Sequence, residues 1–126
     1  MKNLNANRTV KAALLGAALL FFPSLSFARD VSFVWTANPE PVVGYKLYYK
    51  TGTDSAAPYS GSGLTEGSAP IVVGNVTTYT VTGLSPSEAY QFVLTAYNDS
   101  EESGYSEVVT VEPGIAPMII KIEKKS

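Results

Sequence analysis

The most informative stretch of the chain is residues 77–97, TTYTVTGLSPSEAYQFVLTAY, which holds two runs of alternating side chains. In the first run, Tyr79 and Val81 alternate with threonines, and Gly83 follows. In the second run, the large apolar side chains belong to Tyr90, Phe92, Leu94 and Ala96. A period of two is typical of β-strands that bury one face. The stretch therefore predicts two strands joined by a short turn.

Four further runs with one bulky face flank this stretch. They are separated by segments rich in Gly, Pro, Asn and Ser, and we find no convincing helix among them. The runs cover residues 31–35, 45–49, 71–73 and 106–111. Six strands of this kind pack most economically as a two-layer β-sandwich.

The motifs in these runs resemble fibronectin type III domains. Trp35 is followed four residues later by Pro39 and then by GYKLYY at 44–49, which is similar to strands B and C of that family. The segment 77–90 is similar to strand E and the E–F corner, with an LxPxxxY arrangement that ends at Tyr90. AYQFVLTAYN and SGYSEVVTV resemble strands F and G. The likeness spans residues 31–111 and is closest to type III modules of bacterial exported proteins.

The resemblance implies an all-β, immunoglobulin-like sandwich of two antiparallel sheets. It makes Trp35 the central ring of the core, and Tyr90 the corner tyrosine whose hydroxyl bonds to the backbone after Leu84. The expected structural core consists of Trp35, Tyr45, Leu47, Tyr79, Leu84, Tyr90 and Phe92. The family's strand A would be short or missing, because only two residues separate the leader described next from Val31.

Residues 1–28 have the layout of a secretory signal peptide. A basic segment precedes the apolar run AALLGAALLFF at 12–22, and Ser-Phe-Ala ends at Ala28. The run is too short to span a bilayer, which takes about 20 residues. We expect cleavage after Ala28, a domain at 29–112, a tail at 113–126 and no membrane span after cleavage. The product would be secreted or periplasmic in a bacterial envelope.

Composition excludes several functions. The chain has no Cys and no His, so disulfides, thiolate or imidazole metal sites and Ser/His/Asp triads are absent. Three of the nine basic residues lie in the leader and all eleven acidic residues follow it, which leaves a net charge of −5. Such a charge disfavours nucleic acid as a partner. We therefore expect no enzymatic activity, no cofactor and no dedicated metal site.

The tail 113–126 contains the apolar side chains of Met118, Ile119, Ile120 and Ile122. We expect an extra strand at 117–122, either folded back on this domain or added to the exposed edge of a neighbouring molecule. Within one chain, a hairpin back along the last strand is the simpler choice, since parallel pairing is less usual after a short connection. The alternative is a frayed terminus.

One sheet face is a candidate binding surface. The alternation that points Tyr45, Leu47 and Tyr49 inward points four other apolar side chains outward, and these are Tyr48, Val93, Tyr97 and Val108. A contiguous apolar patch with aromatic edges suits contact with a protein or a polysaccharide. The alternative is that these side chains only stabilise the sheet by cross-strand packing.

Two loops complete the set of candidates. The connection 51–70 is long, and we expect Tyr59 to fold back as its anchor. The turn NDSEESG brings Asp99, Glu101 and Glu102 close in sequence, which leaves calcium binding open, although a solvated acidic turn explains it as well.

Together these features predict a secreted, non-catalytic type III module for protein or polysaccharide recognition at the cell exterior. The alternative is a structural subunit that assembles by adding its tail strand to the next copy, so self-association is possible.

Overall fold

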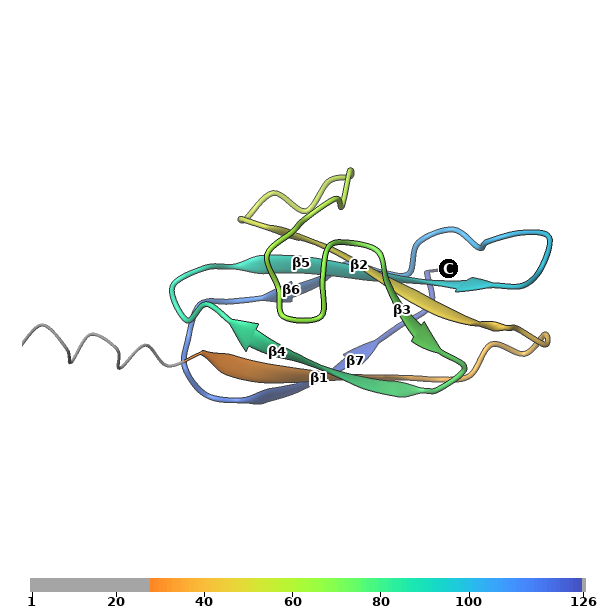
Figure 1. Cartoon of the computed structure of the whole chain (residues 1–126), viewed down its shortest axis with the longest axis horizontal. Coiled ribbons are helices and arrows are strands. Elements are labelled where there is room, and N and C mark those ends of the chain that lie inside the picture. Colours follow the sequence, from red (N-terminus) through yellow and green to blue (C-terminus); the bar gives the residue numbers. More distant parts are fainter. Residues whose placement is uncertain (1–27, 126) are drawn as a thin grey trace, which may run out of the picture.

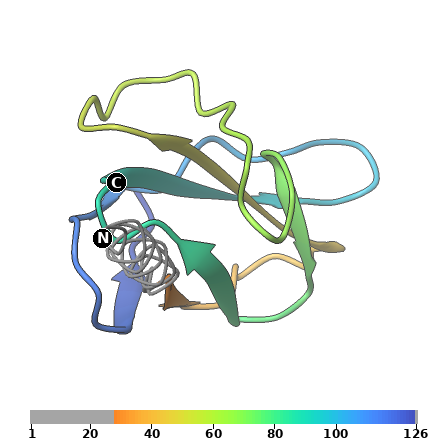
Figure 2. The ribbon, with the colours of Figure 1, turned by 60° about the vertical axis from the view of Figure 1, so that its left-hand side comes forward.

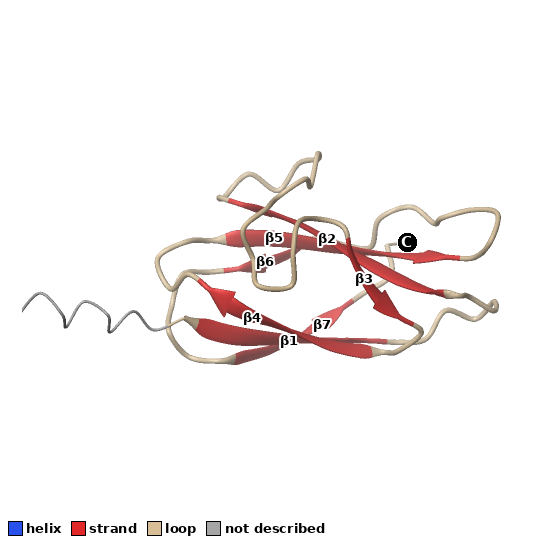
Figure 3. Ribbon diagram, in the orientation of Figure 1, coloured by secondary structure: helices blue, strands red, loops and turns tan. Residues whose placement is uncertain are grey.

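The computed structural model of the chain describes residues 28–125, and within that range it contains seven strands and no helix (Figure 3). The expected signal peptide lies, apart from Ala28, outside the described residues. The strands are β1 (Arg29–Trp35), β2 (Gly44–Thr51), β3 (Ile71–Gly74), β4 (Thr78–Leu84), β5 (Tyr90–Tyr97), β6 (Val109–Val111) and β7 (Met118–Ile122). Across the described range, no helix is long and apolar enough to cross a membrane.

The strands form two facing sheets, which Figure 1 shows as two layers. One sheet has the order β4-β1-β7, and the other has the order β3-β2-β5-β6. This confirms the predicted all-β immunoglobulin-like sandwich. All strand pairs are antiparallel except β1 and β7, which run parallel, so the expectation of purely antiparallel sheets was wrong at one edge.

The core fills the space between the sheets with the inward side chains of every strand. Its centre is aromatic: Phe33 and Phe92 lie with ring centroids 4.6 Å apart, and Tyr49 lies 5.8 Å from Phe92. Six of the seven predicted core residues are buried, and Tyr79 is partly buried against the same cluster. The period-two pattern therefore predicted the buried face of each strand correctly.

Trp35 belongs to the core but is not its central ring. It is the last residue of β1, so it lies at one end of the sandwich, where its ring packs edge-on against Tyr45 at 5.4 Å. Phe33, which is fully buried, takes the central position. The prediction of a central indole was wrong. The family pattern identifies the strand that carries Trp35, but it does not say whether Trp35 lies in the middle or at the end of the packed region between the sheets.

Tyr90 forms the predicted corner. It is the first residue of β5, and its hydroxyl oxygen accepts the backbone N–H of Ser85 at 2.8 Å. Ser85 directly follows Leu84, the last residue of β4. The bond ties the E–F turn to the core and satisfies a backbone donor that would otherwise be left unpaired.

The tail does form a strand, β7, but not in the expected place. It runs parallel to β1, and the turned view in Figure 2 shows the two strands side by side. The hairpin along the preceding strand was therefore the wrong choice. Among residues 28–125 no strand precedes β1, and β7 pairs with the edge of β1 that β4 leaves open.

Burial explains this pairing. The inward side chains of β7 lie opposite the inward side chains of β1, with the pairs Val31↔Met118, Phe33↔Ile120 and Trp35↔Ile122. A hairpin along β6 would have left the edge of β1, and the core behind it, in water. Hydrophobic burial at that edge outweighs the usual preference for antiparallel neighbours.

A buried arginine at the start of β1 contacts both ends of the connection between β6 and β7. Arg29 is 4% exposed, and its guanidinium donates to the carbonyl of Glu112 and contacts Met118 Sδ at 3.5 Å. Arg29 therefore fixes the connection between β6 and β7 against the start of β1.

The long loop between β2 and β3 is anchored at several points along its length. Tyr59 is 6% exposed, as predicted for an anchor, and Leu64 joins the core. Further on, Glu66 accepts the backbone N–H and the hydroxyl of Thr82 in β4, the latter at 2.7 Å. The loop thereby connects the two sheets on the side opposite β7.

Candidate functional site

Glu102 organises the outer face of the four-stranded sheet. It lies in the F–G connection, between β5 and β6, and its carboxylate accepts the hydroxyls of Tyr48 at 2.5 Å and Thr95 at 2.7 Å. The ammonium of Lys46 completes the set at 3.5 Å. Strands β2 and β5 supply these three donors from neighbouring outward positions.

The hydrogen bonds shift the acid–base properties of both partners. Burial of its ring, together with the hydrogen bond and negative charge of Glu102, raises the pKa of Tyr48 to about 12. Partial burial of Glu102 acts to raise the pKa of its carboxyl, but the hydroxyls of Tyr48 and Thr95 and the charge of Lys46 outweigh it and lower that pKa. At neutral pH the tyrosine is a phenol, the glutamate is ionised, and the bond between them is charge-assisted.

Three tyrosine rings continue from this point across the face. Tyr105 packs edge-on against Tyr48 at 5.4 Å and against Tyr59 at 5.2 Å. Tyr105 is 41% exposed, so its ring is held by two neighbours while much of it still faces solvent. Tyr105 was not among the predicted surface residues, because it lies in a loop, where no periodicity marks which way a side chain points.

Val93 does not belong to the accessible surface. It points away from the core, as predicted, but it is fully buried. Its cross-strand partner is Tyr48, against which Tyr105 packs edge-on, and Tyr59 packs edge-on against Tyr105 in turn. The prediction of an exposed Val93 was wrong because the two long loops fold over this part of the sheet.

The other predicted members of the surface remain accessible. Tyr97 is half-buried at the end of β5, with the ammonium of Lys46 4.9 Å from its ring centroid, and Val108 is 38% exposed. We define the aromatic face as Tyr48, Tyr97, Tyr105 and Val108. This surface keeps three of the four predicted residues and adds Tyr105.

The acidic turn shows no arrangement suited to calcium. Asn98 closes the turn by accepting the backbone N–H groups of Ser100 and Glu101 on its side-chain oxygen, while Glu102 points to the sheet. Between residues 28 and 125, no group of three or more acidic, His or Cys side chains is arranged to hold a metal ion.

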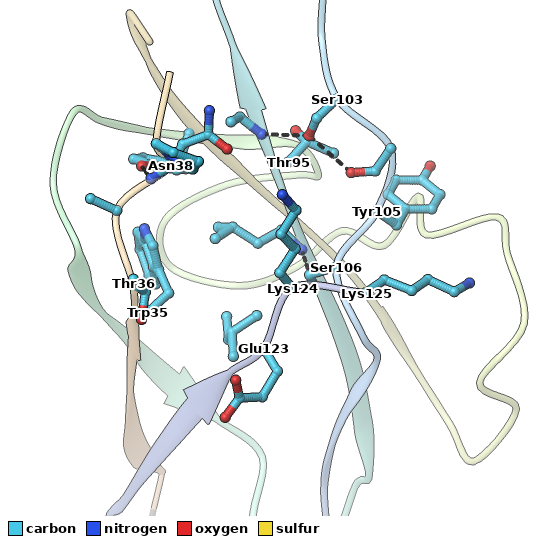
Figure 4. Close-up of a pocket in the computed structure, with 17 residues that line it drawn as sticks. Trp35, Thr36, Asn38, Thr95, Ser103, Tyr105, Ser106, Glu123, Lys124 and Lys125 are labelled. Carbon is cyan, nitrogen blue, oxygen red and sulfur yellow. Dashed lines mark hydrogen bonds between the residues drawn. The ribbon is translucent and has the colours of Figure 1, made fainter. Parts of the chain in front are cut away.

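A cavity of about 640 Å³ opens at the end of the sandwich, next to the aromatic face. Four segments line it: the end of β1 and the residues after it, Tyr45 of β2, the F–G connection with part of β5, and the end of β7 with the chain after it. Trp35 and Tyr105 lie on opposite walls (Figure 4). We refer to this space as the end cavity.

Two serine hydroxyls hold the F–G wall of the end cavity in place. The backbone N–H of Leu94 donates to Ser106 Oγ at 2.9 Å, and the N–H of Ala96 donates to Ser103 Oγ at 2.9 Å. The same serines return their backbone N–H groups to the carbonyls of Leu94 and Ala96. The N–H groups of β5 are therefore accepted by serine hydroxyls where a neighbouring strand would offer backbone carbonyls. As a result, residues 103–106 run alongside β5 without forming a regular strand.

The two facing sheets define an immunoglobulin-like β-sandwich. The profile of the fibronectin type III domain matches residues 26–112, and the chain belongs to the fibronectin type III family. No curated protein matches it. Among solved structures, it is similar to a pilus-presented adhesin, Spy0125 (Cpa), with a TM-score of 0.42 and 12% sequence identity. That match covers 79% of this chain and 26% of the adhesin, so the chain spans about a quarter of the adhesin's length.

Proposed function

We propose that this protein is an exported, non-catalytic fibronectin type III module that recognises a protein or a polysaccharide at the cell exterior. The single observation that carries the proposal is the aromatic face, where Tyr48 and Tyr105 are held in fixed orientations while part of the surface stays exposed. Rigid aromatic side chains provide a large contact area at low entropic cost, which favours binding.

Export is inferred from the leader. The basic, apolar and small-residue segments of residues 1–28 have the pattern of a cleaved signal. Cleavage after Ala28 would leave all of β1 in the product, because that strand begins at Arg29.

The absence of catalysis is inferred from composition and from the site. Without His or Cys, an enzyme would need paired carboxylates or a similar constellation. Glu102, the best-positioned carboxylate on the aromatic face, is already bonded to two hydroxyls and an ammonium. Its role is to orient Tyr48, and that suits a binding surface.

The test is retention of envelope proteins and polysaccharides on the immobilised protein. Replacing Tyr48 and Tyr97 together by Ser should abolish retention while circular dichroism and the melting temperature show an intact fold. The control is Val72→Ser, which removes an exposed apolar side chain from β3 of the same sheet and should leave retention unchanged. Undiminished retention by the double variant would reject the aromatic face as the binding surface.

A further inference from the structure

The end cavity differs from the aromatic face in having a charged side chain directed into it. Figure 4 shows Lys124 pointing into the space, while Glu123 and Lys125 point away from it. Among residues 28–125, no carboxylate lies within ion-pair distance of the Lys124 ammonium, whereas Lys121 pairs with Glu123 at 3.5 Å. An ammonium without a partner in a concave site favours an anionic ligand group.

The location of Lys124 is unusual for this protein. The part of the chain after the leader carries a net charge of −5, yet three of its six basic residues are Lys121, Lys124 and Lys125. The positive charge is therefore concentrated near the end cavity on an otherwise acidic domain. Positive charge of this kind attracts an anionic ligand during approach and favours it over a neutral one.

The backbone at this wall is not available for adding a peptide strand. The N–H groups of Leu94 and Ala96 are taken by the hydroxyls of Ser106 and Ser103. Recognition of extended peptides at a sheet edge depends mainly on free backbone donors and acceptors of this type. A peptide strand could therefore not pair with the backbone N–H groups of Leu94 and Ala96 at this wall.

The remaining lining suits a polyhydroxylated ligand. Thr36 and Asn38 add small polar side chains on the β1 side, and Tyr105 adds a partly exposed ring on the other. A ring that two neighbours hold in place can support an apolar sugar face, while hydroxyl and amide groups bind the sugar's hydroxyls. The cavity volume of about 640 Å³ is in the range typical of small-ligand sites.

We propose that the end cavity binds an acidic polysaccharide, with a sugar carboxylate at the ammonium of Lys124 and a sugar ring against Tyr105. The inference rests on the proposed recognition function and gives it a ligand class and a second contact region.

The experiment uses the only tryptophan in the chain as a reporter. Because Trp35 lines the end cavity, its fluorescence responds to occupation of that space. The probes are oligogalacturonate and its methyl ester, which share a backbone and differ in charge. Oligogalacturonate should shift the fluorescence saturably, and the methyl ester should bind at least about tenfold more weakly, as expected for loss of a charge-assisted bond.

Variants assign the effect to residues. Lys124→Gln should weaken oligogalacturonate binding by about tenfold or more. The matched control is Lys121→Gln, which removes the same charge from the same tail, three residues away, where Glu123 already pairs with it. Tyr105→Phe should retain binding, and Tyr105→Ala should lose it.

Three results would overturn the inference. They are equal binding of the ester, an unchanged Trp35 signal with both probes, and tighter binding of oligoglutamate, which would make the ligand an acidic peptide. In each case, the retention experiment still tests the proposed function. Its Tyr97→Ser arm alone separates the two proposals, because Tyr97 neither lines the end cavity nor packs against Tyr105.

Discussion

Single hydrogen bonds decide how the outer face and the turns of this domain are held. Glu102 has three donors around one carboxylate, and Tyr90 has one donor at its hydroxyl. The Glu102 carboxylate accepts the hydroxyls of Tyr48 and Thr95, and the Tyr90 hydroxyl accepts the backbone N–H of Ser85. These residues therefore provide the most direct tests of local structure.

Tyr90→Phe should destabilise the fold by about 1 kcal/mol, the cost of leaving a partly buried backbone donor without its partner. The variant removes the oxygen that accepts the N–H of Ser85 while it keeps the ring in the core. Urea unfolding measures the effect. Tyr79→Phe is the control, since no hydrogen bond of the Tyr79 hydroxyl is found in the described part of the chain, and the two variants should differ clearly.

Glu102→Gln should lower the pKa of Tyr48 from about 12 toward the ordinary value of 10.0. The shift should be incomplete, because burial of the ring is the largest cause and remains. A tyrosine whose pKa is raised in the folded state stabilises the fold below pH 10, and this contribution is lost as the pH rises through about 12. Alkaline titration of tyrosine absorbance in both proteins checks this, and identical curves would contradict the assigned bond.

The same variant should change the stability of the protein in acid. The pKa of Glu102 is lowered in the folded state. Its carboxylate therefore stabilises the fold when the pH is above 4.5, the ordinary pKa of a glutamate. That contribution is lost as the pH falls through the lowered pKa. Wild type should therefore lose more stability than Glu102→Gln as the pH falls below 4.5, as measured by thermal unfolding across that range.

Among the strands, β7 depends most on contacts that are distant in sequence. Among the strands of residues 28–125 it pairs with β1 alone. The first residue of β7, Met118, lies 89 residues after Arg29, the first residue of β1. Its alternation places Ile122 in the core at 3% exposure and leaves Ile119 78% exposed. The two isoleucines therefore make a matched pair within one strand.

Ile122→Ala should cost about 2–5 kcal/mol of stability, as for other large-to-small substitutions in a core. Ile119→Ala should change stability by no more than about 0.5 kcal/mol, because an exposed side chain is lost. Chemical denaturation of both variants compares them. Similar effects of the two substitutions would mean that β7 is not docked as described.

The molecule as a whole has the edge of β1 covered by its own tail. The assembly alternative needs that edge to accept a strand from another copy. Ser32 and Ile119 are register partners on the outward side of β1 and β7, and the chain has no Cys of its own. This pair offers a direct test of which copy supplies β7.

A Ser32→Cys/Ile119→Cys protein should oxidise to a disulfide within one chain. Non-reducing electrophoresis should then give a monomer band of altered mobility, and light scattering of the unmodified protein should give a monomer. A ladder of disulfide-linked multimers would instead support assembly by strand addition. Mixing the two single-Cys variants is the control, because heterodimers should outnumber the homodimers that each exposed cysteine forms by collision only if strands are exchanged.

The strands, their buried faces and the family can all be read from the order of residues in the chain. The reason is that alternation and turn composition are local properties, which the LxPxxxY corner and the Trp35 strand make specific. Local patterns also explain why Tyr48, Tyr97 and Val108 were correctly expected to point outward.

Contacts between distant segments could not be read in the same way. The burial of Val93, the role of Tyr105 and the end cavity each require loops to be placed over a sheet, and loops carry no periodicity. The position of β7 is a further case, since its pattern fits a hairpin along β6 as well as pairing with β1. Burial of the uncovered core edge beside β1 decided between them, and that edge exists only after the two sheets have packed together.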